Sequence, residues 1–365
     1  MRGLRIGAQV VFGLALLEIC LRVYNPLPSR VRGDRIVLPV RQSYTFTNAG
    51  TRKLDPVTHH TTNSLGFRGP EPPADWAKHV TILTIGGSTT ECTFLSDGRT
   101  WTDQFARRVA TVRADAWVNN AGLDGQSTFG HLVLLQQFVG SLHPTLALFL
   151  IGTNDVERGG ANGYDVALTP QTGGGLHHAL VFLADHSEVA GLAMNAARAI
   201  RARRAGFGHS EVDLTTVPQL HIDEPEIERV LQEHRDKYLA GYRTRVIEIV
   251  QLARRSGITP VLITQPALFG DSVDPSTHVD LGGVQVNGRG NGRLEWRLLE
   301  LYNDVTRQVG AEAGVQVVDL ARAMPKDSRY FYDFLHFTND GAVRVGDVIF
   351  TALAAAIERT PANDR

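Results

Sequence analysis

Cysteine is scarce in this sequence of 365 residues, which contains only Cys20 and Cys92. Two cysteines provide neither the disulfide framework of a small secreted domain nor the ligand set of a structural zinc site. An excess of charge of one sign is also lacking, because 37 lysines and arginines face 38 aspartates and glutamates. The chain therefore has no overall field that favours nucleic acid, and we expect no nucleic-acid partner.

Internal repeats and low-complexity tracts are absent, apart from a few glycine clusters. The composition, 43% hydrophobic and 21% charged, is that of an ordinary globular protein. A chain of this length forms one large domain or two smaller ones. Composition alone thus indicates a protein of enzyme size and no particular activity.

The N-terminus departs from this average composition. A short basic segment, Met1 to Arg5, precedes a mostly apolar run from Ile6 to Tyr24 that Gln9, Glu18 and Arg22 interrupt. We predict a membrane anchor or signal-like helix over residues 1–24, with an amphipathic helix packed on the domain as the alternative. Because basic residues stay on the cytoplasmic side, we expect the protein to be membrane-anchored with its catalytic domain extracytoplasmic.

The remainder divides into a linker and a region that alternates strands with helices. We predict a linker with short strands over residues 25–75, and a main domain over residues 76–360. Within that domain, residues 156–223 break the alternation and are expected to be an insertion, such as a lid or substrate wall. The alternation favours an α/β fold with a parallel sheet covered on both faces. The predicted strands are 80–85, 116–118, 145–151, 260–264 and 315–320, and the predicted helices are 100–112, 131–138, 227–255 and 294–313, with a helical stretch at 187–204 in the insertion.

A Gly-Gly-Ser turn at Gly86, Gly87 and Ser88 follows the first predicted strand. Glycines let the backbone approach a substrate closely, and a serine becomes nucleophilic when a base accepts its proton and donors hold the oxyanion. A helix cap or a phosphate cradle is the alternative explanation. The P-loop pattern fails because no Gly-Lys-Ser/Thr follows, and the turn does not fit the dinucleotide-binding pattern Gly-x-Gly-x-x-Gly either.

A second signal, Asp333 and His336, lies about a dozen residues after the last predicted strand. A spacing of three places both side chains on one side of a single turn, so the carboxylate could accept a proton from one imidazole nitrogen while the other nitrogen faces the serine. Taken alone, such a pair is often a surface turn or a helix cap.

Two further loops follow strands: Gly125 comes after the second and Asn154 directly after the third. Gly125 offers its backbone N–H as a hydrogen-bond donor, and Asn154 offers its side-chain amide. Both loops also contain residues that are common in ordinary turns. Loops at the carboxyl ends of parallel strands meet at one edge of the sheet. The convergence of four such loops favours an active site over four unrelated turns.

These four blocks resemble those of the SGNH hydrolase superfamily, the GDSL-like lipases and esterases. The resemblance covers about residues 60–355 and implies a flavodoxin-like three-layer α/β/α sandwich with a mostly parallel five-stranded sheet, and no metal or organic cofactor. It implies a catalytic triad of Ser88, Asp333 and His336 and an oxyanion hole of Ser88, Gly125 and Asn154. The first block reads Gly-Gly-Ser where the family has Gly-Asp-Ser. The segment Asn63 to Arg68 is similar to one in membrane-anchored bacterial members.

The expected function is a serine esterase that cleaves a carboxylic ester, such as an acetyl ester of an extracytoplasmic glycan or a lipid ester. The partners implied are that small-molecule, lipid or glycan ester and the membrane. Two alternatives stay open: an O-acyltransferase that acts on a polysaccharide with the same triad, and a non-catalytic glycan-assembly module. A binding module has no need of Ser88 or His336, which argues against the last.

Overall fold

A computed structural model describes residues 2–23, 31–32, 35–48, 50–156, 175–204, 209–286, 288 and 290–362. The first part of the predicted linker, up to residue 30, and residues 157–174 of the predicted insertion lie outside these residues.

The centre of the chain is a sheet of five parallel strands in the order β6-β5-β7-β8-β9. Each of the first four is a short, almost wholly buried run, as expected for strands covered on both faces. β5 pairs with β6 on one side and β7 on the other, and β8 joins β7 to β9. The bounds are β5 Val80–Gly86, β6 Ala116–Asn120, β7 Leu146–Ile151, β8 Thr259–Thr264 and β9 Val317–Val318.

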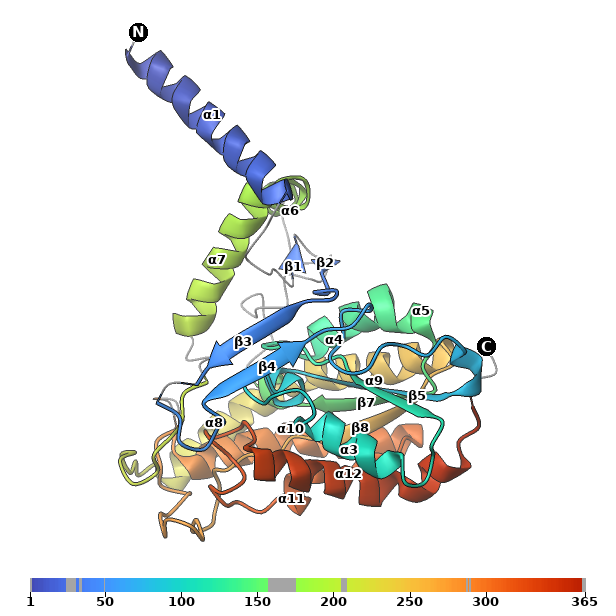
Figure 1. Cartoon of the computed structure of the whole chain (residues 1–365). Coiled ribbons are helices and arrows are strands. Elements are labelled where there is room, and N and C mark those ends of the chain that lie inside the picture. Colours follow the sequence, from blue (N-terminus) through green and yellow to red (C-terminus); the bar gives the residue numbers. More distant parts are fainter. Residues whose placement is uncertain are drawn as a thin grey trace.

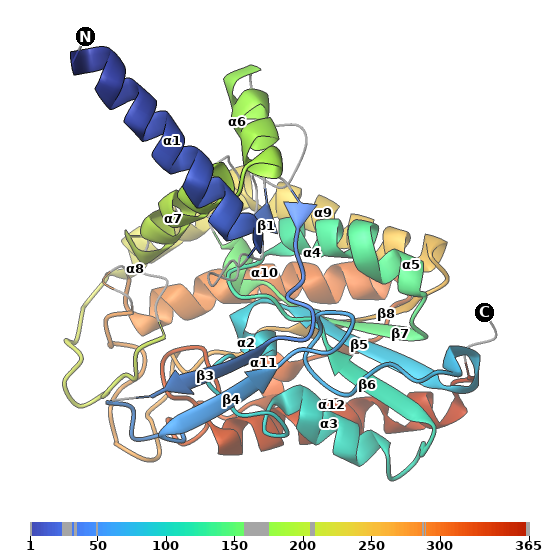
Figure 2. The ribbon, with the colours of Figure 1, turned by 45° about the horizontal axis from the view of Figure 1, so that its top comes forward.

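Helices cover both faces of this sheet, and two cores result (Figures 1 and 2). On one face α3 (Trp101–Val109) packs against α12 (Asn339–Arg359), with Trp101 and Phe105 fully buried. On the other lie α4 (Thr128–Leu134), α9 (Leu239–Arg255) and α10 (Gly292–Ala313). The predicted three-layer α/β/α fold with a five-stranded sheet is therefore confirmed.

Two predicted elements differ from the structure. The helix predicted over residues 227–255 is two helices, α8 (Glu224–Lys237) and α9, which are separated by a turn at Tyr238, where φ is −119°. The last strand, predicted over residues 315–320, is only Val317–Val318, and Leu320 already begins α11 (Leu320–Ala323). Edge strands pair on one side only, so they are easily short.

The helix predicted over residues 131–138 is longer in the structure and begins as α4. α4 continues through a π-helical turn at Leu135–Val139 into α5 (Gly140–Leu142). The short helix α2 (Ser88–Glu91) and two single turns at Trp76–Lys78 and Thr153–Asp155 complete the domain.

Residues ahead of the main domain form two antiparallel pairs. β1 (Val31–Arg32) pairs with β2 (Arg35–Ile36), and β3 (Ser43–Thr47) with β4 (Val57–Thr61). Arg68 then pairs with Asn120 at the end of β6. The segment after β4 thus reaches the edge of the sheet at which the strand-end loops lie.

Three helices stand apart from the sandwich (Figures 1 and 2). α1 (Arg2–Val23) projects away from the domain, and its residues Arg5–Val23 are long and apolar enough to cross a membrane. α6 (Gly175–His186) and α7 (Glu188–Arg204) belong to the predicted insertion and form a hairpin that meets the C-terminal part of α1.

Candidate active site

Ser88 lies at the turn between β5 and α2, and its side chain meets a histidine from the other end of the chain. The Ser88 Oγ is 2.7 Å from Nε2 of His336. Ser88 is almost buried and lines a cavity. A hydroxyl in this position can pass its proton to the imidazole as it attacks.

Asp333 holds the other side of the same imidazole. Its Oδ2 is 2.6 Å from Nδ1 of His336, and its Oδ1 accepts the backbone N–H groups of Leu335 and His336 at 2.8 and 2.7 Å. Burial raises the pKa of Asp333, but the charge and the hydrogen bonds of His336 outweigh burial and hold that pKa below its ordinary value. The carboxylate is therefore ionised and fixes the tautomer in which Nε2 faces Ser88.

Asn154 lies against the backbone that precedes the serine. Its Nδ2 donates to the carbonyl oxygen of Gln126 at 2.9 Å, and a Cβ placed on Gly87 would be only 2.3 Å from that nitrogen. A side chain at position 87 is therefore incompatible with this place for Asn154. Glycine at position 87 thus leaves room for the Asn154 amide.

A buried ion pair fixes the loop that carries Asn154. The next residue, Asp155, accepts the backbone N–H of Thr128 at 3.2 Å and faces the guanidinium of Arg245 at 3.3 Å. Both charged side chains are buried, where removal of one partner leaves an uncompensated charge. The loop after β7 is therefore tied to α4 and α9 and held against the sheet edge.

Gly125 lies in the loop after β6, with φ of +73°, a conformation that favours glycine. The preceding residue, Asp124, donates its backbone N–H to the Glu91 carboxylate at 2.6 Å. Arg68 donates to the carbonyl oxygens of Glu91 and Cys92 at 2.9 and 2.7 Å. The buried Arg68 guanidinium thus holds the end of α2, and Glu91 of that helix holds the loop of Gly125.

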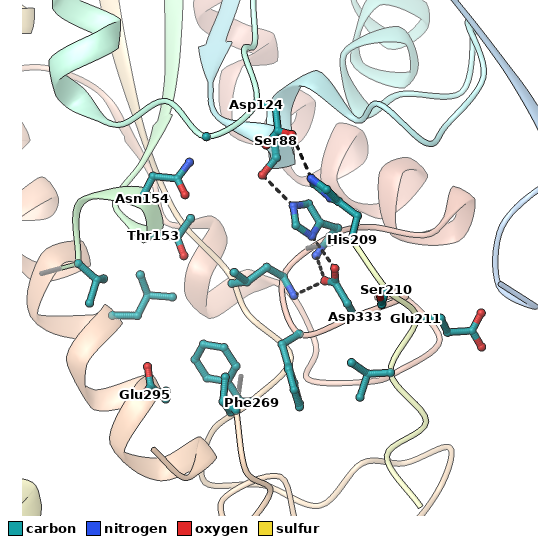
Figure 3. A pocket seen from close by; sticks show the side chains of 18 residues that line it. Ser88, Asp124, Thr153, Asn154, His209, Ser210, Glu211, Phe269, Glu295 and Asp333 are labelled. Atoms are coloured by element: carbon teal, nitrogen blue, oxygen red, sulfur yellow. Dashed lines mark hydrogen bonds and ion pairs between the residues drawn. The ribbon is translucent and has the colours of Figure 1, made fainter. Parts of the chain in front are cut away.

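All five residues predicted for the site line one cavity of about 310 Å³ (Figure 3). We call the loops after β5, β6 and β7 the strand-end wall; their cavity-lining residues are Ser88, Asp124, Gly125, Thr153, Asn154 and Val156. Phe269 and Glu295 lie at the end of the cavity away from Ser88 (Figure 3). Further apolar lining comes from Val286, Leu299, Phe334 and Leu335.

The opposite wall comes from the predicted insertion, for which the sequence suggested a lid or substrate wall without indicating which residues line the cavity. Residues 209–212, here called the insertion wall, line the cavity beside His336. The ring of His209 lies 4.2 Å from that of His336 between centroids. Its Nε2 is 3.1 Å from Asp124 Oδ2, and its Nδ1 is 3.3 Å from the Tyr332 hydroxyl. No local pattern in the sequence marks His209, because these partners come together only in three dimensions.

The electrostatics of His209 follow from these contacts. Burial lowers its pKa, but the hydrogen bond and charge of Asp124 outweigh burial and raise that pKa above its ordinary value. A second imidazole, with a raised pKa, therefore lies beside the one that faces Ser88.

Metal binding has one candidate group among the described residues. His209, Asp333 and His336 place ligand atoms within 4.8 Å of one another. Asp333 and His336 are already bonded to each other, and His336 to Ser88. The hydrogen bonds account for this cluster without an ion.

Comparisons with known proteins bear on the domain that carries this cavity. The model of the GDSL-like lipase/acylhydrolase family matches residues 84–344. These residues begin within β5 and end within α12, so the match includes every residue predicted for the site. No curated protein matches the chain in sequence.

Solved structures similar to the chain share little sequence with it. An α/β hydrolase from the metagenome of Lake Arreo in Spain is 15% identical, with 77% of this chain and 98% of that chain covered and a TM-score of 0.43. A catalytic variant of an acetylxylan esterase from Geobacillus stearothermophilus is 14% identical, with 75% and 93% covered and a TM-score of 0.43. A GDSL-like lipase from Bacteroides thetaiotaomicron is 13% identical, with 80% and 92% covered and a TM-score of 0.39.

Proposed function

The chain belongs to the GDSL-like lipase/acylhydrolase family, and on that premise we propose that Ser88, His336 and Asp333 are its catalytic triad. The chain is therefore an ester-hydrolysing enzyme. The observation that carries the proposal is the line of hydrogen bonds from Ser88 Oγ through the His336 ring to Asp333, which lies on the cavity.

In the first half of the reaction, Ser88 Oγ attacks the ester carbonyl carbon while its proton passes to Nε2 of His336. Asp333 stabilises the imidazolium that forms. Nε2 then gives the proton to the leaving-group oxygen as the bond between that oxygen and the carbonyl carbon breaks, and the alcohol leaves. An acyl group remains on Ser88.

The oxyanion of each tetrahedral intermediate needs donors, and we assign this role to three groups. They are the backbone N–H groups of Ser88 and Gly125 and the side-chain amide of Asn154, whose nitrogen carries a second hydrogen besides the one given to Gln126. Water then attacks the acyl group with His336 as the base, and the acid and free Ser88 result.

The cavity supports an ester with a short acyl chain. Its volume of about 310 Å³ is at the lower end of the range for small-molecule sites, roughly 300–1,000 Å³. Apolar side chains such as Phe269 and Leu299 line it, while Glu211 and Glu295 disfavour an anionic substrate. An acetyl ester of a glycan and a short lipid ester both fit this description.

A series of p-nitrophenyl esters from acetyl to palmitoyl, together with acetylated sugars, tests the substrate class. We expect the highest kcat/KM with acyl chains of a few carbons and a steep fall for long chains. A maximum with palmitoyl would contradict a short-acyl site.

A fluorophosphonate probe tests the nucleophile itself. The probe should label the protein once, and Ser88→Ala should abolish labelling. Ser210→Ala is the matched control, because Ser210 lines the same cavity on the insertion wall. Equal labelling of wild type and Ser88→Ala would refute the assignment.

We also propose that α1 anchors the enzyme in a membrane, with the catalytic domain extracytoplasmic. The apolar stretch Arg5–Val23 supports a span, and the basic residues Arg2 and Arg5 at its N-terminal end support a cytoplasmic N-terminus. The full chain should sediment with membranes, and a chain that begins at Leu27 should stay in solution with its esterase activity. Full-length protein found wholly in the cytosol would overturn this proposal.

A further inference from the structure

Exposed apolar side chains concentrate on two helices. Of the 18 large apolar side chains that are exposed among the described residues, nine lie on α1 and three on α6. The other six are all valines, so every exposed leucine or phenylalanine outside α1 in that set lies on α6: Leu180, Phe182 and Leu183. Phe182 is 62% exposed. Such a cluster marks a surface that contacts something other than water.

The exposed cluster occupies one side of α6, and the opposite side is packed. Val181 and Ala184 are buried, whereas Leu180, Phe182 and Leu183 fall on the remaining arc of the helix at 100° per residue. The helix has no lysine, arginine or glutamate, and Asp185 pairs with Arg35 at 3.3 Å. The three apolar side chains share this outward arc with His186, whose ring stacks on that of Phe182 at 4.1 Å between centroids.

Glu18 attaches the α6–α7 hairpin to α1. Its carboxylate accepts the Ser187 hydroxyl at 2.8 Å and the backbone N–H groups of Glu188 and Val189 at 3.0 and 3.1 Å, which caps the first turn of α7. Arg22 donates to the carbonyl oxygen of His186 at 2.6 Å. These bonds tie the hairpin to α1, and Figure 1 shows the end of α1 beside α6 and α7.

The position of Glu18 sets the depth of the hairpin. It precedes the end of the apolar stretch, Val23, by five residues, which at 1.5 Å per residue is about 7.5 Å. Interfacial helices bury their apolar side about 5–10 Å into the boundary between headgroups and acyl chains. If α1 spans the membrane, the tip of the hairpin is held at that depth.

We propose that α6 lies in the interface of a phospholipid bilayer, with Leu180, Phe182 and Leu183 among the upper acyl chains beside the point at which α1 leaves the membrane. This proposal rests on the anchoring role proposed for α1. α6 and α7 belong to the same insertion as the wall of the cavity at residues 209–212, so contact with lipid holds the active site close to the bilayer surface.

Fluorescence quenching in vesicles tests the position of α6. The full chain, with Cys20→Ser, is reconstituted in phosphatidylcholine and phosphatidylglycerol vesicles, and Leu183→Cys carries the environment-sensitive dye NBD. Burial raises the pKa of Cys92 to about 12, so this cysteine stays unlabelled. Matched single-cysteine variants are Leu14→Cys on α1 and Val343→Cys on α12, both at exposed positions.

We expect the dye at position 183 to shift to the blue and to be quenched more strongly by a shallow than by a deep doxyl lipid. The dye at position 14 should be quenched, and the dye at position 343 should not. If position 14 is quenched and position 183 is not, the interfacial role of α6 is wrong while anchoring stands. If neither is quenched, anchoring itself fails. A blue shift at 183 without quenching by lipid would assign the surface to a protein and overturn the proposal.

Discussion

The cavity has two walls of different construction. On the strand-end wall, buried groups fix each loop, such as Arg245 against Asp155 and Glu91 against the backbone of Asp124. Among the described residues, the insertion wall lacks such an ion pair: Val212 donates its backbone N–H to the carbonyl oxygen of the buried Tyr332 at 2.9 Å, and His209 meets the half-exposed Asp124.

The strand-end wall carries groups of the catalytic chemistry, whereas the insertion wall contributes to the shape of the cavity. Catalytic groups work only within a narrow geometry, so they belong where packing and buried hydrogen bonds over-determine the backbone. A wall that carries none of the catalytic groups can vary with less effect on that geometry. We therefore expect substitutions on the strand-end wall to cost orders of magnitude in kcat, and those on the insertion wall to cost much less.

The largest effect should come from the triad. Ser88→Ala or His336→Ala should each lower kcat by about 10⁶, and the double variant should be no worse than either, because the two residues act as one unit. Circular dichroism serves as the control for folding. Additive losses in the double variant would contradict a shared role.

The next effect should come from the oxyanion hole. Asn154→Ala should lower kcat by about 10²–10³ with little change in KM, because the oxyanion exists only after the attack. Gly87→Ala should displace Asn154, since a Cβ there meets its amide at 2.3 Å, and should lower kcat in the same way. The two together should cost little more than either alone. Lost stability with unchanged turnover would mean that Asn154 only holds a turn.

Strand-end loops are the part of the molecule that local sequence predicts well. Short apolar runs predicted four of the five strands to within a few residues, since parallel strands buried on both faces are mostly apolar. Because the strands are parallel, Ser88, Gly125 and Asn154 were expected at one edge of the sheet. Topology and residue type together therefore indicated where the cavity lies. Asp333 and His336 followed because their spacing of three fits one turn.

The insertion wall could not be predicted in the same way. His209 contacts Asp124 and Tyr332, which lie 85 and 123 residues away in the sequence, and no periodicity reports such contacts. The break at Tyr238 was missed because the apolar pattern continues across it. The dependence of α7 on Glu18 was hidden for another reason: a carboxylate in an apolar run looks like an interruption until its partners are known.

A moderate effect should follow from removal of the His209 ring. His209→Ala leaves a gap beside the His336 ring and should lower kcat about tenfold, less than the ~100-fold that a 1 Å displacement can cost. His209→Gln, which can still bond Asp124, should recover part of that loss. Ser210→Ala on the same wall should leave kcat unchanged. A loss as large as that of Asn154→Ala would erase the proposed difference between the walls.

The smallest effect should be on stability, and its sign follows from the raised pKa of His209. A histidine with a higher pKa in the folded than in the unfolded state, where it is about 6.5, binds protons more tightly when folded. Its contribution is complete below the unfolded pKa and is lost as pH rises through the folded pKa. Asp333, whose pKa is lowered, acts in the opposite direction, but only in acid below its ordinary range.

Urea unfolding of wild type and His209→Gln from pH 5.5 to 8.5 measures this contribution. The free energy of unfolding of wild type should exceed that of the variant most at pH 5.5, and part of the difference should disappear by pH 8.5. The pH-dependent part should be about 1 kcal/mol or less, because Asp124 is half-exposed and solvent screens the pair. Asp124→Asn should reduce the same pH dependence, since it removes the hydrogen bond and charge that raise the pKa of His209 most. A difference that grows with pH would mean that burial, and not Asp124, controls His209, and the insertion wall would then be held by packing alone.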